Sequence, residues 1–144
     1  MNGPLPWQAC ALLSAAFAAL TANLGKVGVQ GTNPDFATFV RTVVILCVLA
    51  AIVTGSGQWQ APGSVSGRTY LFLVLSGLAT GASWICYFRA LRIGDAARVA
   101  PVDKLSMVLV AVFGATFLGE RLSGLNWFGV VLVGAGVILL GLRA

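Results

Sequence analysis

Long apolar stretches without charge alternate with short polar connections along the chain. Charged side chains are absent from residues 1–25, 42–67, 69–88, 105–119 and 122–142. About 20 apolar residues are enough to carry a helix across the ~30 Å hydrocarbon core of a bilayer. The pattern therefore predicts an all-α fold of five transmembrane helices, forming a single domain over residues 1–144. The expected helices are about 7–26, 35–54, 69–91, 96–117 and 125–142.

Helix-capping and helix-breaking residues mark the ends of these segments. Asn33 is expected to cap the second helix, with Pro34 at its first position. Residues 55–67, which are rich in Gly, Ser, Gln and Pro, form the longest predicted connection. Asp95 is a candidate cap of the fourth helix, and Pro101 should kink that helix.

Composition supports the membrane assignment and narrows the chemistry. Charged residues are 9% of the chain, against about 25% in an ordinary soluble domain. A possible signal-peptidase site at Ala16-Phe17-Ala18 lacks a preceding basic region, so we expect the first helix to be retained. The three cysteines are expected to be packing thiols. With no histidine and four carboxylates, we expect no metal, no cofactor and no catalytic residues, and hence no enzyme.

The charged residues are distributed unequally between the two sides of the predicted bundle. Threading the chain through the bilayer five times places seven cations on one side and Arg68 and Arg121 on the other. The seven are Lys26, Arg41, Arg89, Arg92, Arg98, Lys104 and Arg143. Because cations near short loops stay cytoplasmic, the bias predicts an external N-terminus and a cytoplasmic C-terminus.

Several charges fall inside the predicted membrane spans. A fourth helix of about 20 residues that ends at Gly119 draws Asp103 and Lys104 roughly one turn into the membrane, and Arg41 lies ~9 Å into the second. An unpaired charge there costs about 2.5–3.5 kcal/mol. Asp103 is too short to reach water, so it needs a partner, and the candidates are Lys26, Arg41 and Lys104. The group is either a polar cavity open to the cytoplasm or a structural ion pair, and the sequence favours neither.

Two aromatic residues near the end of the third helix extend this candidate site. Trp84 lies ~22 Å along that helix, too deep for an outer aromatic belt, and Tyr87 follows on the same face. Trp84 is either a cavity wall that stacks on a substrate or receives a cation, or part of the inner belt.

Two junctions carry a resemblance to a known family. Residues 90–101 (ALRIGDAARVAP) resemble the third-to-fourth helix junction of EamA-type proteins in the drug/metabolite transporter superfamily. Residues 117–122 (FLGERL), followed by Trp127, Gly129, Gly134 and Gly136, are similar to that family's fourth-to-fifth junction. The resemblance covers the whole chain. Larger members carry two inverted five-helix copies, so this chain resembles the single-copy branch.

The resemblance implies a transporter of small polar metabolites that works as an oligomer by alternating access in a bacterial or archaeal plasma membrane. The preferred contacts are Arg41, Trp84, Tyr87, Asp103 and Lys104, and the cation excess favours an anionic or zwitterionic substrate. The superfamily's multidrug exporters use a carboxylate in helix one, but residues 7–25 hold none, so that mechanism does not carry over. The alternative is a non-transporting membrane subunit that stabilises or regulates a partner.

We expect a homodimer, and we expect no nucleic-acid partner. Glycine recurs every seven residues in the fifth helix, as Gly129/Gly136 and Gly134/Gly141. Such small faces let backbones approach closely, which makes this helix a plausible seam for a parallel dimer.

Overall fold

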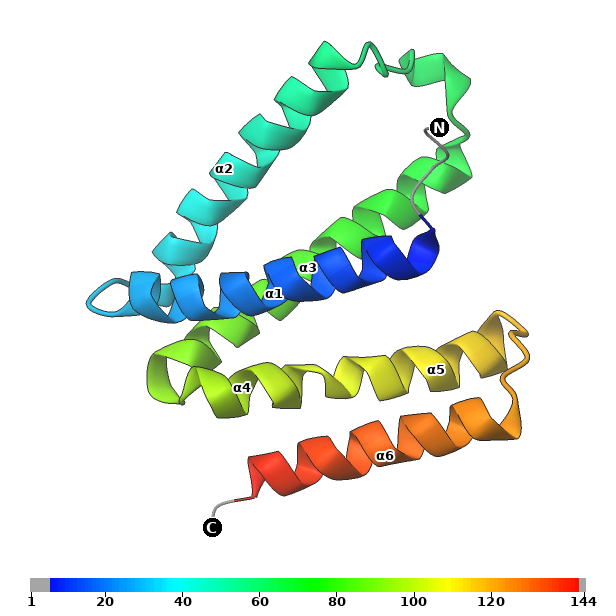
Figure 1. Cartoon of the computed structure of the whole chain (residues 1–144). Coiled ribbons are helices and arrows are strands. Elements are labelled where there is room, and N and C mark those ends of the chain that lie inside the picture. The colour runs from blue at the N-terminus through cyan, green and yellow to red at the C-terminus, as the bar shows by residue number, and fades with distance from the viewer. Residues whose placement is uncertain (1–5, 143–144) are drawn as a thin grey trace. The chain divides into compact units, whose positions relative to one another are not determined.

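The computed structural model describes residues 6–142, and the regular elements in that range are helices joined by short connections (Figure 1). Its elements are α1 (Trp7–Val29), α2 (Pro34–Gly55), the 3-10 turn η1 (Pro62–Ser64), α3 (Gly67–Ile93), α4 (Ala96–Asp103), α5 (Leu105–Phe117) and α6 (Gly124–Gly141). Among the described residues, five spans are long and apolar enough to cross a membrane: α1, α2, α3, α4 with α5, and α6. The predicted all-α membrane class is confirmed.

The starts of α2 and α6 follow from local capping chemistry. Asn33 Oδ1 accepts hydrogen bonds from the backbone N–H groups of Asp35 (2.9 Å) and Phe36 (3.4 Å), ahead of Pro34 at the first helical position. Ser123 Oγ accepts the N–H of Asn126 at 3.2 Å. These bonds satisfy helix N–H groups that have no partner within the helix.

Asp95 is the N-cap residue of α4, as the sequence predicts, although its side chain makes no capping hydrogen bond. The N–H of Arg98, which a capping carboxylate would accept, donates instead to the main-chain oxygen of Asp95 at 3.0 Å. The carboxylate is therefore not needed for this helix start.

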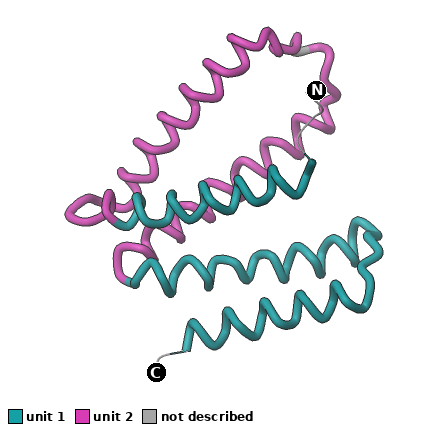
Figure 2. The backbone as a smooth tube through the Cα atoms, viewed as in Figure 1, with its two compact units in different colours: residues 1–26, 94–144 teal, residues 27–93 magenta. Residues whose placement is uncertain are grey.

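The chain forms two compact units, which Figure 2 colours separately. Unit 1 comprises residues 1–26 and 94–144, and unit 2 comprises residues 27–93. In unit 2, the start of α2 lies beside the end of α3, and the two helices diverge toward the connection that contains η1 (Figure 1). In unit 1, α5 and α6 run side by side as an antiparallel hairpin.

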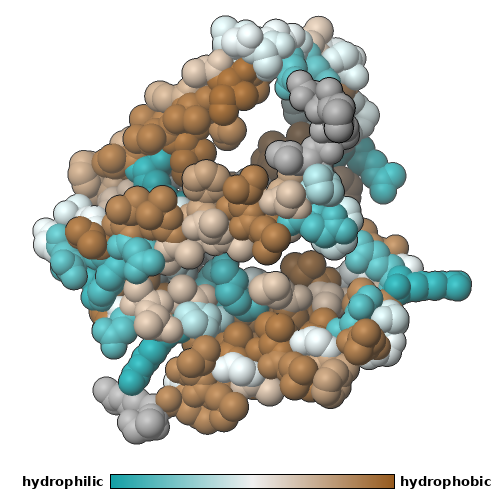
Figure 3. All heavy atoms as spheres, viewed as in Figure 1, coloured by the Kyte–Doolittle hydropathy of each residue, from teal (hydrophilic) through white to brown (hydrophobic). Residues whose placement is uncertain are grey.

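The surfaces of the helices are apolar. Hydrophobic residues predominate on the visible faces of α2 and α6 (Figure 3), and Leu46 and Leu132 are 65% and 56% exposed. Among the residues that the structure describes, few large apolar side chains are buried, and Val29 and Leu91 are fully enclosed. Apolar side chains are unfavourable when exposed to water but favourable when exposed to lipid, so this surface fits helices that lie in a bilayer.

Candidate functional site

Arg41 on α2 contacts aromatic rings of α3 within unit 2. Its guanidinium carbon lies 4.6 Å from the centroid of the Trp84 ring and 5.0 Å from that of Phe88. Trp84 and Phe88 are four residues apart, so they occupy the same face of α3. Arg41 is half-buried and Phe88 is buried. Cation–π contacts of this kind contribute up to about 2 kcal/mol when they are desolvated, which offsets part of the cost of holding the charge in the span.

Tyr87 extends this aromatic group. Its ring meets that of Phe88 edge to face, with centroids 6.0 Å apart and an interplanar angle of 69°. Edge-to-face packing is a favoured arrangement because the positive edge of one ring meets the negative face of the other. Arg41 is thereby supported on a small aromatic cluster formed by Trp84, Tyr87 and Phe88.

A bidentate ion pair joins α2 and α3 nearer their ends. Arg89 donates from Nε to Asp35 Oδ1 at 2.9 Å and from Nη2 to Asp35 Oδ2 at 2.7 Å. The two side chains remain 62% and 48% exposed. The fork geometry makes the pair specific, whereas its exposure keeps its contribution to stability small.

The fourth span is interrupted where its charged residues lie. α4 ends at Asp103, and α5 begins at Leu105. Pro101 has no N–H to continue the hydrogen-bond ladder. Around the break, the Lys104 N–H bonds to the Pro101 oxygen and the Met107 N–H to the Lys104 oxygen, both at 2.9 Å and both tighter than an α-helical step. The missing Pro101 N–H would have bonded to the oxygen of Ala97, before the break, so the break at Lys104 lies beyond the stretch that Pro101 disturbs directly. A kink at Pro101 stays a prediction.

Asp103 pairs with its neighbour in sequence. Lys104 Nζ lies 3.3 Å from Asp103 Oδ2, and the two side chains are 48% and 33% exposed. Of the three partners that the sequence allowed, Lys104 makes the pair within the described residues. Lys26 Nζ instead donates to the main-chain oxygen of Gly94 at 2.7 Å, within unit 1. That contact joins the end of α1 to the segment that precedes α4.

The predicted site residues therefore fall into two sets. Arg41, Trp84 and Tyr87 belong to unit 2, and Asp103 and Lys104 belong to unit 1. Sequence reasoning missed Phe88, although its position one turn after Trp84 was a usable signal. It also treated Asp35 and Arg89 as separate charges, since residues 54 apart give no local sign of a pair.

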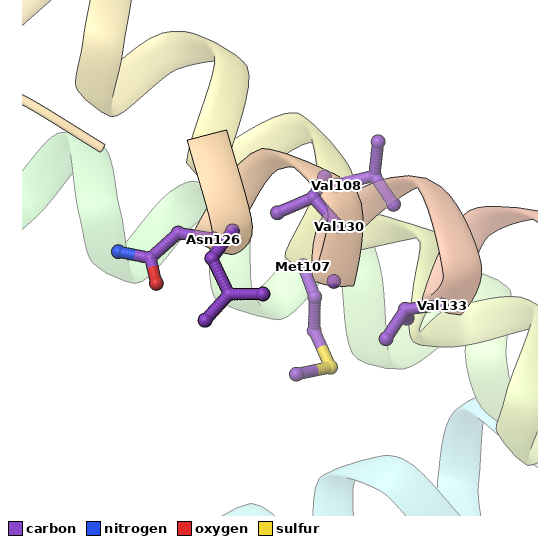
Figure 4. Close-up of a pocket in the computed structure, with 7 residues that line it drawn as sticks. Met107, Val108, Asn126, Val130 and Val133 are labelled. Atoms are coloured by element: carbon purple, nitrogen blue, oxygen red, sulfur yellow. The ribbon is translucent and has the colours of Figure 1, made fainter. Parts of the chain in front are cut away.

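Unit 1 also holds an apolar hollow between α5 and α6, of about 370 Å³ (Figure 4). Met107 and Val108 line it from α5, and Asn126, Val130 and Val133 line it from α6. Asn126 is the single polar side chain among the described residues around it. Such a lining suits lipid or a neighbouring helix better than a polar solute.

Within residues 6–142, no group of three metal-ligating side chains comes together. The three cysteines are free thiols and are all exposed. They lie on three different helices, α1, α2 and α3.

Five membrane-spanning helices, one of them interrupted beside an ion pair, define a multi-pass membrane protein with charged side chains inside its spans. The chain belongs to the EamA-like transporter family, whose profile matches residues 5–142. The family resemblance seen in the two helix junctions is confirmed. No solved structure matches the chain.

Relatives of two sizes are similar to this chain. An uncharacterized transporter in the cobO 3' region of a Sinorhizobium species is 68% identical over 93% of this chain and 95% of its own length. Subunit ArnE of Salmonella enteritidis, named a probable 4-amino-4-deoxy-L-arabinose-phosphoundecaprenol flippase subunit, is 32% identical over 69% of this chain and 97% of its own length. An uncharacterized transporter of Bacillus subtilis, YxxF, is 26% identical, and the match covers 90% of this chain but 40% of YxxF.

Proposed function

We propose that this chain carries a small polar metabolite across a bacterial membrane by alternating access. The observation that supports the proposal is the interruption of the fourth span at Lys104, beside the Asp103 carboxylate. Discontinuous helices of secondary transporters supply freed backbone groups and half-helix ends at substrate and ion sites. A helix break beside a charge would also act as a hinge, because the short tight turn absorbs backbone rotation.

Two sets of residues are the proposed contacts for substrate or coupling ion. Asp103 and Lys104 lie at the break in unit 1, and Arg41, Trp84 and Tyr87 form the aromatic-supported cation of unit 2. An ionisable residue inside a span is a functional-site candidate by default, because its cost must be offset. The cation excess favours an anionic or zwitterionic substrate.

The test is transport by the purified chain. A thermal-shift screen would first select metabolites that stabilise the protein, since a ligand that binds the folded state raises its stability. Uptake of those compounds would then be measured in proteoliposomes for the wild type, for Asp103→Asn and for Glu120→Gln as a control at the opposite end of the span. We expect Asp103→Asn to lose uptake and Glu120→Gln to retain it. Stabilising compounds that the wild type never moves would contradict the proposal.

The proposed location is the bacterial inner membrane, with the N-terminus outside and the C-terminus in the cytoplasm. The charge bias supports this orientation. One of the seven cations, Arg143, lies outside the described residues. Reporter tags at each terminus should give opposite signals, and equal populations of both orientations would show that the bias does not decide topology.

The proposed assembly is a parallel homodimer of single five-helix domains. A match that covers only two fifths of the Bacillus relative supports a second copy. On α6, added Cβ atoms at Gly129 and Gly136 would meet nothing within 4 Å, whereas at Gly134 and Gly141 they would meet Val108 and Val102. The open pair is thus the better seam. Single cysteines along α6 should crosslink with a period near 3.5 residues about this pair, and a monomeric mass without crosslinks would exclude the dimer.

The second candidate function is that of a membrane subunit that does not transport alone. The name of the Salmonella relative, a flippase subunit, favours it, because nearly the whole of that protein aligns with this chain. A subunit would copurify with a different membrane protein from its native membrane. Uptake by the purified chain alone would exclude this alternative, and uptake only after the partner is added would establish it.

A further inference from the structure

The charge balance of unit 2 is the starting point for a narrower assignment. Residues 27–93 contain four arginines and one acidic residue, Asp35. Both carboxylate oxygens of Asp35 are engaged by Arg89, at 2.9 and 2.7 Å. Arg41 therefore has no carboxylate to pair with inside its own unit, even though it lies about 10 Å beyond the first residue of a membrane span.

The aromatic contacts of Arg41 do not use the N–H donors of its guanidinium group. The Trp84 and Phe88 contacts, at 4.6 and 5.0 Å, engage the charge of the guanidinium rather than its N–H groups. A guanidinium carries five N–H donors in a rigid fork that matches the paired oxygens of a carboxylate or phosphate. In a low-dielectric span, a charge-assisted pair of this kind is much stronger than in water.

We propose that Arg41, supported by Trp84 and Phe88, binds an oxyanion, namely the carboxylate or phosphate group of the transported molecule. The inference rests on the proposed transport function and narrows its substrate from polar to anionic. A zwitterion is a poorer match at this site because its ammonium group would need an acceptor. The one carboxylate of the unit is already engaged, and two of the ring faces already carry a cation.

The oxyanion has two possible sources, a soluble metabolite or the phosphate of a lipid headgroup that enters from the bilayer. Both present the same group to Arg41. Arg41 lies within a helix whose surface is mostly apolar, as Phe39 and Val44 at 63% and 55% exposure illustrate. The experiment must therefore separate the sources as well as detect the binding.

Trp84 provides a direct readout. With Trp7, Trp59 and Trp127 replaced by Phe, the full-length protein in a phosphate-free detergent reports through Trp84 alone. Inorganic phosphate, acetate and a short-chain phosphatidic acid would be titrated separately at constant ionic strength. We expect a saturable change in Trp84 fluorescence with at least one of the three. Tighter binding of phosphate would indicate a soluble metabolite as the source of the oxyanion, and tighter binding of phosphatidic acid would indicate a lipid headgroup.

The variants test the role of the fork. Arg41→Gln should abolish the response, and Arg41→Lys should weaken it by about tenfold or more, because an ammonium cannot make the bidentate contact. Arg68→Gln is the matched control: its guanidinium also lies over an aromatic ring of α3, that of Phe72 at 5.8 Å, but outside the cluster. Arg68→Gln should give the same fluorescence response as the parent protein, in which Arg41 and Arg68 are both present. If Arg41→Gln fails to fold, the test is the ratio of the dissociation constants measured for Arg41→Lys and for the parent protein.

The results separate this inference from the proposed function. Saturable binding that depends on Arg41, in a protein that moves nothing in proteoliposomes, would support the oxyanion site and reject the transporter. Transport that is unchanged in Arg41→Lys, together with no saturable response to any of the three probes, would reject the oxyanion site and retain the transporter. An equal response in the parent and in Arg41→Gln would place the anion elsewhere and overturn the inference.

Discussion

Two helix pairs of this protein are joined in different ways. In unit 2, α2 and α3 meet near one end through the Asp35–Arg89 ion pair and the stacking of Arg41 on α3, and they diverge toward the other end. In unit 1, α4 and α5 meet α6 through small residues, with Val108 against Gly134 and Val102 against Gly141. One pair is joined locally by polar groups and the other over its length by close packing.

The difference follows from what holds helices together in lipid. Apolar side chains gain little by leaving lipid for one another, so association depends on close backbone approach or on polar contacts. Packing of the first kind fixes a pair over several turns. A contact of the second kind fixes one point and leaves the remainder of the pair adjustable. The cation of the candidate site lies on the adjustable pair, where a change of helix angle would alter its surroundings.

The largest effect is expected where a bulky side chain would be inserted between α5 and α6. A Cβ at Gly134 would lie 3.5 Å from Val108 Cγ2, in ordinary contact, so Gly134→Leu would push α5 and α6 apart. We expect the free energy of unfolding in mixed micelles to fall by about 1–3 kcal/mol, as overpacking usually costs. The control is Gly77→Leu within α3, outside the proposed seam, where a Cβ also meets nothing within 4 Å. Because leucine favours a helix more than glycine does, equal losses would show that the larger side chain itself, rather than the α5–α6 contact, sets the effect.

A smaller effect is expected at the break between α4 and α5. Asp103→Ala leaves Lys104 without its carboxylate, at a point inside the span. Because Lys104 is 48% exposed and can extend toward water, the loss should be about 1 kcal/mol rather than that of a fully buried charge. Glu120→Ala, at the end of the same span, should cost less. Matching small values for the two would indicate that Asp103 is already solvated.

Charge spacing was enough to predict the helices, because apolar length in a membrane protein is fixed by the bilayer. The start of α2, with Asn33 as its cap and Pro34 at its first position, could also be predicted because it depends on neighbours in sequence. The choice among partners distant in sequence could not be predicted. Asp103 had three possible partners, and the structure is needed to show that it pairs with Lys104 while Lys26 bonds to the Gly94 oxygen. The glycine repeat of α6 predicted one seam, whereas in the structure Gly134 and Gly141 face valines of the same chain. Periodicity identifies a small face but not what covers it.

The ion pair of unit 2 gives a third test, which concerns geometry more than stability. Asp35→Asn removes one charge of an exposed pair, so the free energy of unfolding should barely change. The distribution of distances between spin labels at the start of α2 and the end of α3 should instead broaden, because the ion pair that holds these two ends together is lost. The double exchange Asp35→Arg with Arg89→Asp should restore the narrow distribution. A distribution that stays narrow in Asp35→Asn would mean that the aromatic cluster alone fixes this end.

The smallest effect is expected at Gly114, a close contact whose other side can move. A Cβ there would lie 2.7 Å from Glu120 Oε2, which is closer than atoms tolerate, but that oxygen is the tip of a flexible side chain. The turn beneath it is made by the backbone, since the Gly114 oxygen accepts the N–H groups of Leu118 and Glu120 at 3.2 and 3.0 Å, and Gly119 has φ +69°. Gly114→Ala should therefore displace the carboxylate and leave the turn intact, changing the free energy of unfolding by less than about 0.5 kcal/mol. In a Glu120→Ala background the same substitution should stabilise the protein by up to about 1 kcal/mol, because alanine favours a helix more than glycine does. The two values come from a double-mutant cycle measured in mixed micelles. A loss of more than about 1 kcal/mol in both backgrounds would place a rigid atom against Gly114, and the end of α5 would then be packed as tightly as its contact with α6 at Gly134.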